Sequence, residues 1–310
     1  MERFSNTDQL KQDNFITAAA LVAANFFYGT NVIAVKLISP SLISPLGLSF
    51  ARMFFSALVL LAMRLFYTPK EKIHRSDYPV LILAGFLGIT CNQILSIMGI
   101  ASTNPINASL LNMATPIIVT LLATIFLKEK FGMNNVLGLM LGLAGAVILI
   151  NGRKTTNAAN EATLMGDIFV LLASVCYSTY LILMRRVSTK YSPLTILRFV
   201  FLFGTVFSIP FCFGGFMDAT WSNFNGASWY AIFHVIILGT LLSNILMNWG
   251  VMKWGPSRTG SFIYFQPLFG TIGAVLLMGE QFTFTKTIAG LLIIAGVWIT
   301  SRKSKKTIKA

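Results

Sequence analysis

Ten stretches of this chain are apolar over about the length of a membrane-spanning helix. The hydrocarbon core of a bilayer is about 30 Å thick, so a spanning helix needs about 20 mostly apolar residues. Lipid offers the backbone no hydrogen bonds, and a single segment satisfies its own backbone only as a helix. The sequence therefore predicts an all-α membrane protein with ten transmembrane helices. The apolar runs are 15–37, 45–67, 78–100, 105–127, 133–151, 164–187, 193–214, 228–251, 257–278 and 284–301.

The composition excludes a soluble fold. Charged residues make up 11% of the chain and hydrophobic residues 55%, whereas a soluble domain carries about 25% charged residues. The segments between the runs are short, and none is long enough for a separate soluble domain. The polar residues that precede the first run are followed by no early small-residue cleavage site. We therefore expect the first run to be a retained helix and not a cleaved signal peptide.

The basic residues are distributed as membrane topology requires. The net charge is +14, but lysines and arginines lie in short segments between apolar runs, so we expect no nucleic-acid partner. With the N-terminus inside, 18 of the 24 basic residues fall in inside segments and four in outside segments, while Arg52 and Arg198 lie within runs. Cytoplasmic loops carry an excess of basic residues. The bias predicts that both termini face the cytoplasm.

The sequence contains an internal repeat. Residues 88–148 match residues 239–299 without a gap, at an offset of 151 residues, with 14 identities in 61 positions. Farther upstream, with small gaps, Tyr28 pairs with Tyr177. The ungapped identities include Gly88/Gly239, Pro105/Pro256, Pro116/Pro267 and Glu129/Glu280. Apolar bias alone does not place two prolines and a glutamate in one register, so we interpret the chain as duplicated.

The repeat divides the chain into residues 1–151 and 152–310, each with five predicted helices. An odd number of crossings places the second copy upside down in the membrane. Inverted repeats that meet at the bilayer midplane are typical of secondary transporters, in which one half rocks against the other. The sequence therefore predicts ten transmembrane helices in two inverted five-helix repeats around a central cavity.

The duplicated motifs resemble the EamA family of the drug/metabolite transporter superfamily over nearly the whole chain. The residues that carry this resemblance are Asn31 to Lys36, Ser44-Pro45-Leu46, Phe50-Ala-Arg52, Pro105, Ala108, Pro116, Lys128-Glu129, Tyr177, Tyr180, Arg185-Arg186, Pro193, Arg198, Pro256, Pro267 and Gly279-Glu280. The resemblance implies a ten-helix bundle with a central cavity. It also implies export or exchange of amino acids, other metabolites or drugs across a bacterial inner membrane.

Uncharged polar residues inside the apolar runs are the candidate substrate-binding residues. Polar groups are costly in lipid and face the protein interior or a water-filled cavity. The set suits a zwitterion or another polar or amphipathic metabolite, and the alternative is hydrogen bonding between helices without substrate contact. The candidates are Asn25, Tyr28, Asn31, Asn92, Gln93, Asn107, Asn112, Tyr177, Tyr180, Asn244, Asn248, Tyr264 and Gln266.

Three charged or titratable residues within runs are candidates for gating. Arg52 and Arg198 fall at related positions of the two halves. Each is expected either to snorkel or cap a helix end or to act as a gate or bind a substrate carboxylate. His234 is titratable near neutral pH. No Asp or Glu lies at the centre of a run, so we expect facilitated diffusion or exchange in preference to strict proton symport.

The remaining features narrow the function class. The chain has two histidines, in different regions, and no HExxH, nucleophile elbow or phosphate loop, so we expect no enzyme and no cofactor. The three cysteines lie in apolar runs and have no metal-ligand spacing. Glycines 138, 142 and 145 share one helix face, which serves either packing or homodimerisation. A small-molecule transporter is the favoured interpretation; a receptor or scaffold and a proton-coupled drug exporter are the alternatives.

Overall fold

A computed structural model of the chain describes residues 2–67, 71–112, 114–127, 133–151, 164–187, 190–279, 281 and 283–301. Within these ranges the regular secondary structure is helical throughout. The first half contains α1 (Glu2–Ile38), α2 (Pro45–Tyr67), η1 (Arg75–Asp77), α3 (Tyr78–Ala84), η2 (Gly85–Cys91), α4 (Asn92–Ser102), α5 (Pro105–Asn112), α6 (Thr115–Leu127) and α7 (Met133–Asn151). The second contains α8 (Leu164–Val187), α9 (Pro193–Met217), η3 (Trp221–Asn223), α10 (Gly226–Phe233), η4 (His234–Leu242), α11 (Ser243–Gly260), η5 (Ser261–Tyr264), α12 (Phe265–Met278) and α13 (Phe284–Ser301).

Six helical segments of the described residues are long and apolar enough to cross a membrane. They are Asp13–Ile38, Pro45–Leu65, Arg75–Ser102, Leu164–Met184, Pro193–Met217 and Gly226–Gly250. Shorter apolar segments at Pro105–Val119, Val136–Gly145, Leu268–Met278 and Phe284–Gly296 fall within the other four predicted runs. The chain is therefore a multi-pass membrane protein, and the count of ten spans stays a prediction.

Two of the predicted single helices contain a π-helical segment in the middle. In the run 78–100 this segment is η2, and in the run 228–251 it is η4. The two π-helices end 151 residues apart, in the register of the sequence repeat. Hydroxyl groups donate to carbonyls five residues earlier, from Thr90 to Gly85 (3.4 Å) and from Thr240 to Val235 (2.7 Å). Such segments recur at functional sites of helical proteins.

Two other runs are divided differently from the sequence expectation. The run 105–127 is interrupted between α5 and α6, ahead of Pro116, where proline cannot continue the hydrogen-bond ladder. The run 257–278 is shared by the end of α11, by η5 and by α12. Glu129 and Glu280 lie outside the described residues.

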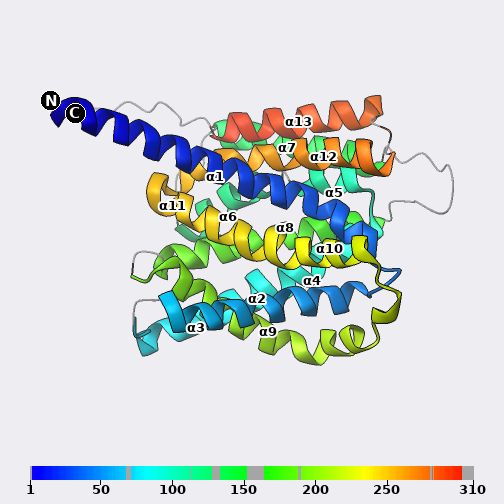
Figure 1. The fold of residues 1–310 in the computed structure, drawn as a ribbon. Helices are drawn as coiled ribbons and strands as arrows, with labels where there is room; N and C mark the ends of the chain where they lie inside the picture. Colours follow the sequence, from blue (N-terminus) through cyan, green and yellow to red (C-terminus); the bar gives the residue numbers. More distant parts are fainter. Residues whose placement is uncertain are drawn as a thin grey trace.

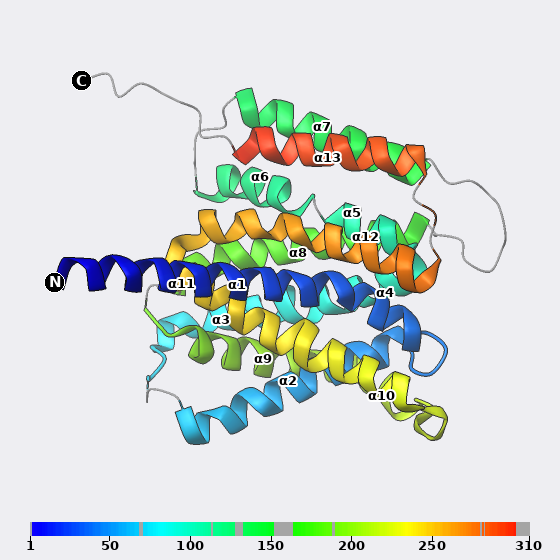
Figure 2. The ribbon, with the colours of Figure 1, turned by 45° about the horizontal axis from the view of Figure 1, so that its top comes forward.

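The helices form a bundle in which two peripheral pairs flank a central group. Figures 1 and 2 show α7 and α13 together at one edge, and α2 and α9 at the opposite edge. Between them lie α1, α12, α5, α8, α4 and the segment from α10 to α11 (Figure 2). Helix α1 begins and α13 ends on the same side of the bundle (Figures 1 and 2).

The glycine face of α7 is used for packing within the chain. A Cβ at Gly145 would lie 2.7 Å from the carbonyl oxygen of Ala289 on α13, and one at Gly296 would lie 2.5 Å from that of Gly138. Small residues let the two helix backbones approach closely where lipid gives no hydrophobic drive. This face is therefore packed within the chain, against α13 at Gly145 and against Ile117 of α6 at Gly142.

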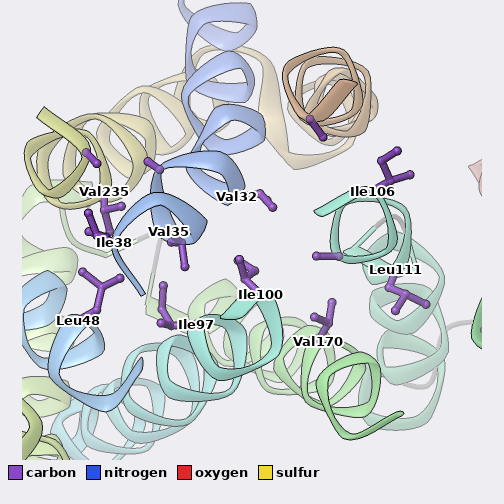
Figure 3. Close-up of a cluster of buried hydrophobic side chains, with 14 of the residues drawn as sticks. Val32, Val35, Ile38, Leu48, Ile97, Ile100, Ile106, Leu111, Val170 and Val235 are labelled. Carbon is purple, nitrogen blue, oxygen red and sulfur yellow. The ribbon is translucent and has the colours of Figure 1, made fainter. Parts of the chain in front are cut away.

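Branched side chains of α1 form the centre of the buried core. Figure 3 shows them pointing into a space that they share with α2, α4, α5, α8 and η4. The labelled residues are Val32, Val35, Ile38, Leu48, Ile97, Ile100, Ile106, Leu111, Val170 and Val235. Helix α1 thus packs against elements from both halves of the chain.

Candidate functional site

The first helix of each half contacts the π-helix of the other half through a glycine. Tyr180 of α8 lies against Gly88 of η2, where a Cβ would overlap its ring. Asn31 of α1 lies against Gly239 of η4, where a Cβ would be 2.5 Å from its Oδ1. Each pair is the repeat equivalent of the other, since both members are shifted by about 150 residues. Helices α1 and α8 run in opposite directions (Figure 2), and both glycines lie near the centre of a membrane-length segment, Gly88 in Arg75–Ser102 and Gly239 in Gly226–Gly250.

Two hydrogen bonds next to these contacts repeat the same pattern. The Asn92 side-chain amide donates to the carbonyl of Ala173 on α8 (2.9 Å). The Ser243 hydroxyl donates to the carbonyl of Ala24 on α1 (3.2 Å). Both donors directly follow their π-helix, and both acceptors belong to the first helix of the other half. The halves are therefore joined at the middle by two equivalent crossed connections.

Three tyrosines and an arginine gather where the halves meet. The Tyr28 phenol lies within electrostatic range of the Tyr177 and Tyr180 phenols and of the Arg52 guanidinium. The Tyr177 and Tyr180 rings are 5.7 Å apart between centroids and are tilted by 32°. This cluster offers aromatic faces, hydroxyl groups and one positive charge, which together suit an amphipathic zwitterion.

Arg52 holds the backbone of η4. Its Nη2 donates to the carbonyl of Gly239 (3.1 Å), and its Nε donates to the Thr240 hydroxyl. The side chain is 5% exposed, so it does not snorkel to an interface. A π-helix disrupts the regular backbone ladder, and a buried carbonyl without a partner is costly. Arg52 therefore stabilises the π-helix beside the contact between Asn31 and Gly239.

His234 lies at the start of η4, against α1. Its Nε2 is 3.0 Å from the Thr30 hydroxyl, and its ring stacks on Tyr230 at 6.2 Å between centroids. Its other ring nitrogen, Nδ1, has no partner among the described residues. His234 is also within electrostatic range of Arg52. Two of the three gating candidates, Arg52 and His234, therefore lie at η4.

Several buried polar atoms near the interface of the halves have no hydrogen-bond partner among the described residues. They include Oδ1 of Asn25, Asn31 and Asn107, and Oγ of Ser109. Most buried polar atoms in proteins are paired with protein or ordered water. Acceptors of this kind leave hydrogen-bonding capacity for water or for a polar ligand.

The other predicted site residues lie elsewhere or bond locally. Asn244 and Asn248 donate to carbonyls four residues earlier, at 2.7 Å and 2.8 Å. Gln93 is buried, and Asn112 and Gln266 are half-buried. The side chain of Tyr264 lies outside the described part of the chain. These residues are not joined to the tyrosine cluster by any hydrogen bond that the described structure shows.

Arg198 is separated from Arg52 by the structure. It lies near the start of α9, 4.9 Å above the Phe199 ring, within electrostatic range of Arg64 and Glu71. The two arginines therefore have different surroundings, although they occupy related positions in the sequence. Arg52 binds η4 in the interior, whereas Arg198 lies at the end of the bundle.

Sequence reasoning missed the partners that make the contacts. The sequence pattern does not distinguish Thr30 and Thr240 from other hydroxyl residues, and it does not pair Cys91 with Cys176. The two thiols interact with each other, and Cys91 follows Gly88 by three residues while Cys176 precedes Tyr180 by four. The identity of Gly88 and Gly239 in the repeat was the one signal that pointed to these contacts.

The two halves also meet at one end of the bundle through a buried carboxylate. Asp77 is 1% exposed and accepts hydrogen bonds from Lys190 Nζ at 3.0 Å and 3.1 Å. It accepts a third from the Tyr191 hydroxyl at 2.8 Å. Charge-assisted bonds of this kind are stronger than neutral ones, so they hold the connection before α3 against the connection before α9.

Glu71 adds a second carboxylate to this joint between the halves, which Asp77, Lys190 and Tyr191 form. At the opposite end of the bundle the halves are joined by uncharged groups. Glu71 accepts from the backbone and hydroxyl of Ser192 at 3.0 Å and 3.1 Å. Burial opposes ionisation of the Glu71 carboxyl, but hydrogen bonds from Ser192 and Thr195 outweigh it and lower its pKa. At the other end, the Thr220 backbone and hydroxyl donate to the carbonyl of Leu42 at 3.0 Å and 3.1 Å.

Comparison with known families identifies both halves of the chain. The model of the EamA-like transporter family matches residues 15–151 and again residues 164–302. The chain is 25% identical to the uncharacterized transporter YetK of Bacillus subtilis over 289 residues, covering 93% of this chain and 87% of that protein. It is 23% identical to the uncharacterized inner membrane transporter YicL of Salmonella typhimurium, covering 94% and 96%.

More distant similarity extends to plants and to a solved structure. The WAT1-related protein At3g53210 of Arabidopsis thaliana is 23% identical, covering 70% of this chain and 66% of that protein. A solved crystal structure superposes with a TM-score of 0.62 at 19% identity, covering 91% of this chain and 95% of the other. At this identity the superposition supports the fold alone.

Proposed function

Because the chain belongs to the EamA-like transporter family, we propose that it moves a small polar or amphipathic metabolite across the bacterial inner membrane by alternating access. The observation that carries this proposal is the crossed pair of contacts, Tyr180 on Gly88 and Asn31 on Gly239. Each contact joins the first helix of one half to the π-helix of the other half. Opening one while the other stays closed would expose the tyrosine cluster to one side of the membrane at a time.

The chemistry of the cluster favours an amino acid or a related zwitterion. Aromatic faces and phenol hydroxyls accept an apolar body together with an amine. A guanidinium has five N–H donors, and Arg52 uses Nε and Nη2 to hold η4. Its other donors are suited to a carboxylate. An amphipathic substrate with one carboxylate therefore fits this set better than a polyanion or a purely apolar molecule.

We propose that transport proceeds by facilitated diffusion or exchange in preference to strict proton symport. A proton-driven carrier needs a titratable group at depth. Among the described residues the buried carboxylates are Asp77, which accepts from Lys190 at the end of the bundle, and Asp167, which accepts from the Thr103 hydroxyl. His234 lies 3.0 Å from the Thr30 hydroxyl, next to the contact between Asn31 and Gly239. Export or exchange is the proposed direction, in line with the family resemblance.

Counterflow in proteoliposomes tests the proposal. We expect vesicles preloaded with an unlabelled amino acid to accumulate the labelled form transiently, because exchange needs no energy source. Gly88→Ala and Gly239→Ala should each lower the rate at least about fivefold, since overpacking costs about 1–3 kcal/mol in the state where the contact is closed. Gly214→Ala is the matched control, because nothing lies within 4 Å of its added Cβ.

Two outcomes would contradict the proposal. Substrate binding without counterflow would favour a receptor or scaffold. Accumulation driven by an imposed pH gradient and abolished by His234→Ala would favour a proton-coupled exporter.

A further inference from the structure

A groove lies between α2 and α9, the pair of helices at one edge of the bundle (Figure 1). Its volume is about 390 Å³, and its lining is apolar apart from Thr205. The Thr205 hydroxyl donates within α9 to the carbonyl of Phe201 (2.8 Å). The groove therefore presents hydrocarbon and aromatic surface, and its contents must be apolar.

The groove has the length of one leaflet of a bilayer. On α2 it extends from Phe50 to Leu61, which corresponds to about 16 Å at 1.5 Å per residue. One leaflet is about half of a hydrocarbon core that is roughly 30 Å thick. Phe50 also packs against Phe213 of α9, with ring centroids 5.5 Å apart, so aromatic rings close the far end.

Two arginines lie one helical turn beyond the end of the groove that is opposite Phe50 and Phe213. Arg64 follows Leu61 by three residues on α2, and Arg198 precedes Leu202 by four on α9. Residues three or four apart share a helix face, so both arginines continue the two walls of the groove. They lie within electrostatic range of each other. The distribution of basic residues predicts that this end faces the cytoplasm.

Arg64 and Arg198 bring two positive charges to this end of the groove. Glu71 is the carboxylate within range of Arg198, and it already accepts hydrogen bonds from Ser192. Arg198 is 5% exposed, and its Nη1 has no partner among the described residues. An anion at this position would relieve the repulsion between the two guanidiniums. Basic pockets between transmembrane helices on the cytoplasmic side suit anionic lipid headgroups.

We propose that the α2–α9 groove binds one anionic phospholipid, with an acyl chain in the groove and the phosphate beside Arg64 and Arg198. A second copy of the chain fits less well. A two-fold interface through this edge would bring both pairs of arginines together, and neither α2 nor α9 contains an acidic residue.

Native mass spectrometry of the purified, delipidated protein tests the site. Phosphatidylglycerol and phosphatidylcholine are titrated separately, and the bound fraction is measured for each. We expect phosphatidylglycerol to bind more tightly, with a loss of about fivefold for Arg64→Gln, because a basic residue near the headgroup contributes about that factor. Arg186→Gln removes an exposed charge from α8 and should leave the preference unchanged.

Filling the groove is the second arm of the test. Val206→Trp places an indole in the lining, whereas Leu143→Trp changes an equally exposed residue of α7. We expect only Val206→Trp to abolish binding of both lipids. Equal affinity of the native protein for the two lipids would overturn the proposal, as would full competition by inorganic phosphate. A dimer that Val206→Trp dissociates would assign the groove to a second copy and would also overturn it.

Discussion

Gly239→Ala tests the packing between the halves most directly. The added Cβ would lie 2.5 Å from Asn31 Oδ1, 2.9 Å from its Cγ and 3.1 Å from its Cβ. Ordinary contact begins near 3.4 Å, so α1 and η4 must separate or Asn31 must leave its position. Overpacking of this kind costs about 1–3 kcal/mol. Alanine favours a helix over glycine by about 1 kcal/mol, which offsets part of that cost.

A double-mutant cycle with Asn31→Ala isolates the clash. In that background the nearest remaining Asn31-derived atom is Cβ at 3.1 Å, and a shift of a few tenths of an ångström relieves it. We therefore expect Gly239→Ala to cost about 1 kcal/mol in the native chain and less than about 0.5 kcal/mol with Asn31→Ala. Gly214→Ala reports the helix-propensity gain alone, since its Cβ meets nothing within 4 Å.

Thermal unfolding of the detergent-solubilised protein measures the cycle. A loss of 1 kcal/mol lowers the melting temperature by about 2–4 °C in a protein somewhat smaller than this one. The expected result is a clear fall for Gly239→Ala that Asn31→Ala largely removes. An equal fall in both backgrounds would refute the contact between α1 and η4 as its cause.

Three further predictions concern other parts of the interface. Oxidation with copper phenanthroline should cross-link Cys91 to Cys176 and stop counterflow, because α8 is then held against η2; mass spectrometry of the digest detects the link, and full activity of the cross-linked protein would contradict a moving contact. Arg52→Ala should leave the Gly239 carbonyl without its donor and lower stability by about 1–3 kcal/mol, whereas Arg52→Lys should restore part of it in the same thermal assay. The pKa of Glu71 is lowered in the folded state, so its stabilisation is present above the unfolded pKa of about 4.3 and is lost as pH falls through the folded pKa; Glu71→Gln should remove that part of the acid dependence, and an unchanged pH profile would exclude it.

The site was predictable in its composition and only partly in its geometry. Tyr28 and Tyr177 could be paired because they occupy equivalent places in the repeat, and both belong to the cluster. Asn244 shares a polar helix face with Asn248, yet each donates to the carbonyl four residues earlier in the chain. A polar residue in an apolar run is equally compatible with a carbonyl four residues away and with a partner on another helix. Composition alone cannot distinguish a hydrogen bond within one helix from a hydrogen bond to another helix.

Hydropathy and the 151-residue register determined a membrane protein made of two related halves, because lipid requires long apolar helices and duplication preserves spacing. The tertiary structure decided how the halves meet. It placed the π-helices η2 and η4 opposite α8 and α1, and it directed Arg52 to η4 while leaving Arg198 at the end of α9. Those contacts depend on which faces of distant helices come together. A repeat register and a hydrophobic period specify the faces of single helices but not their partners.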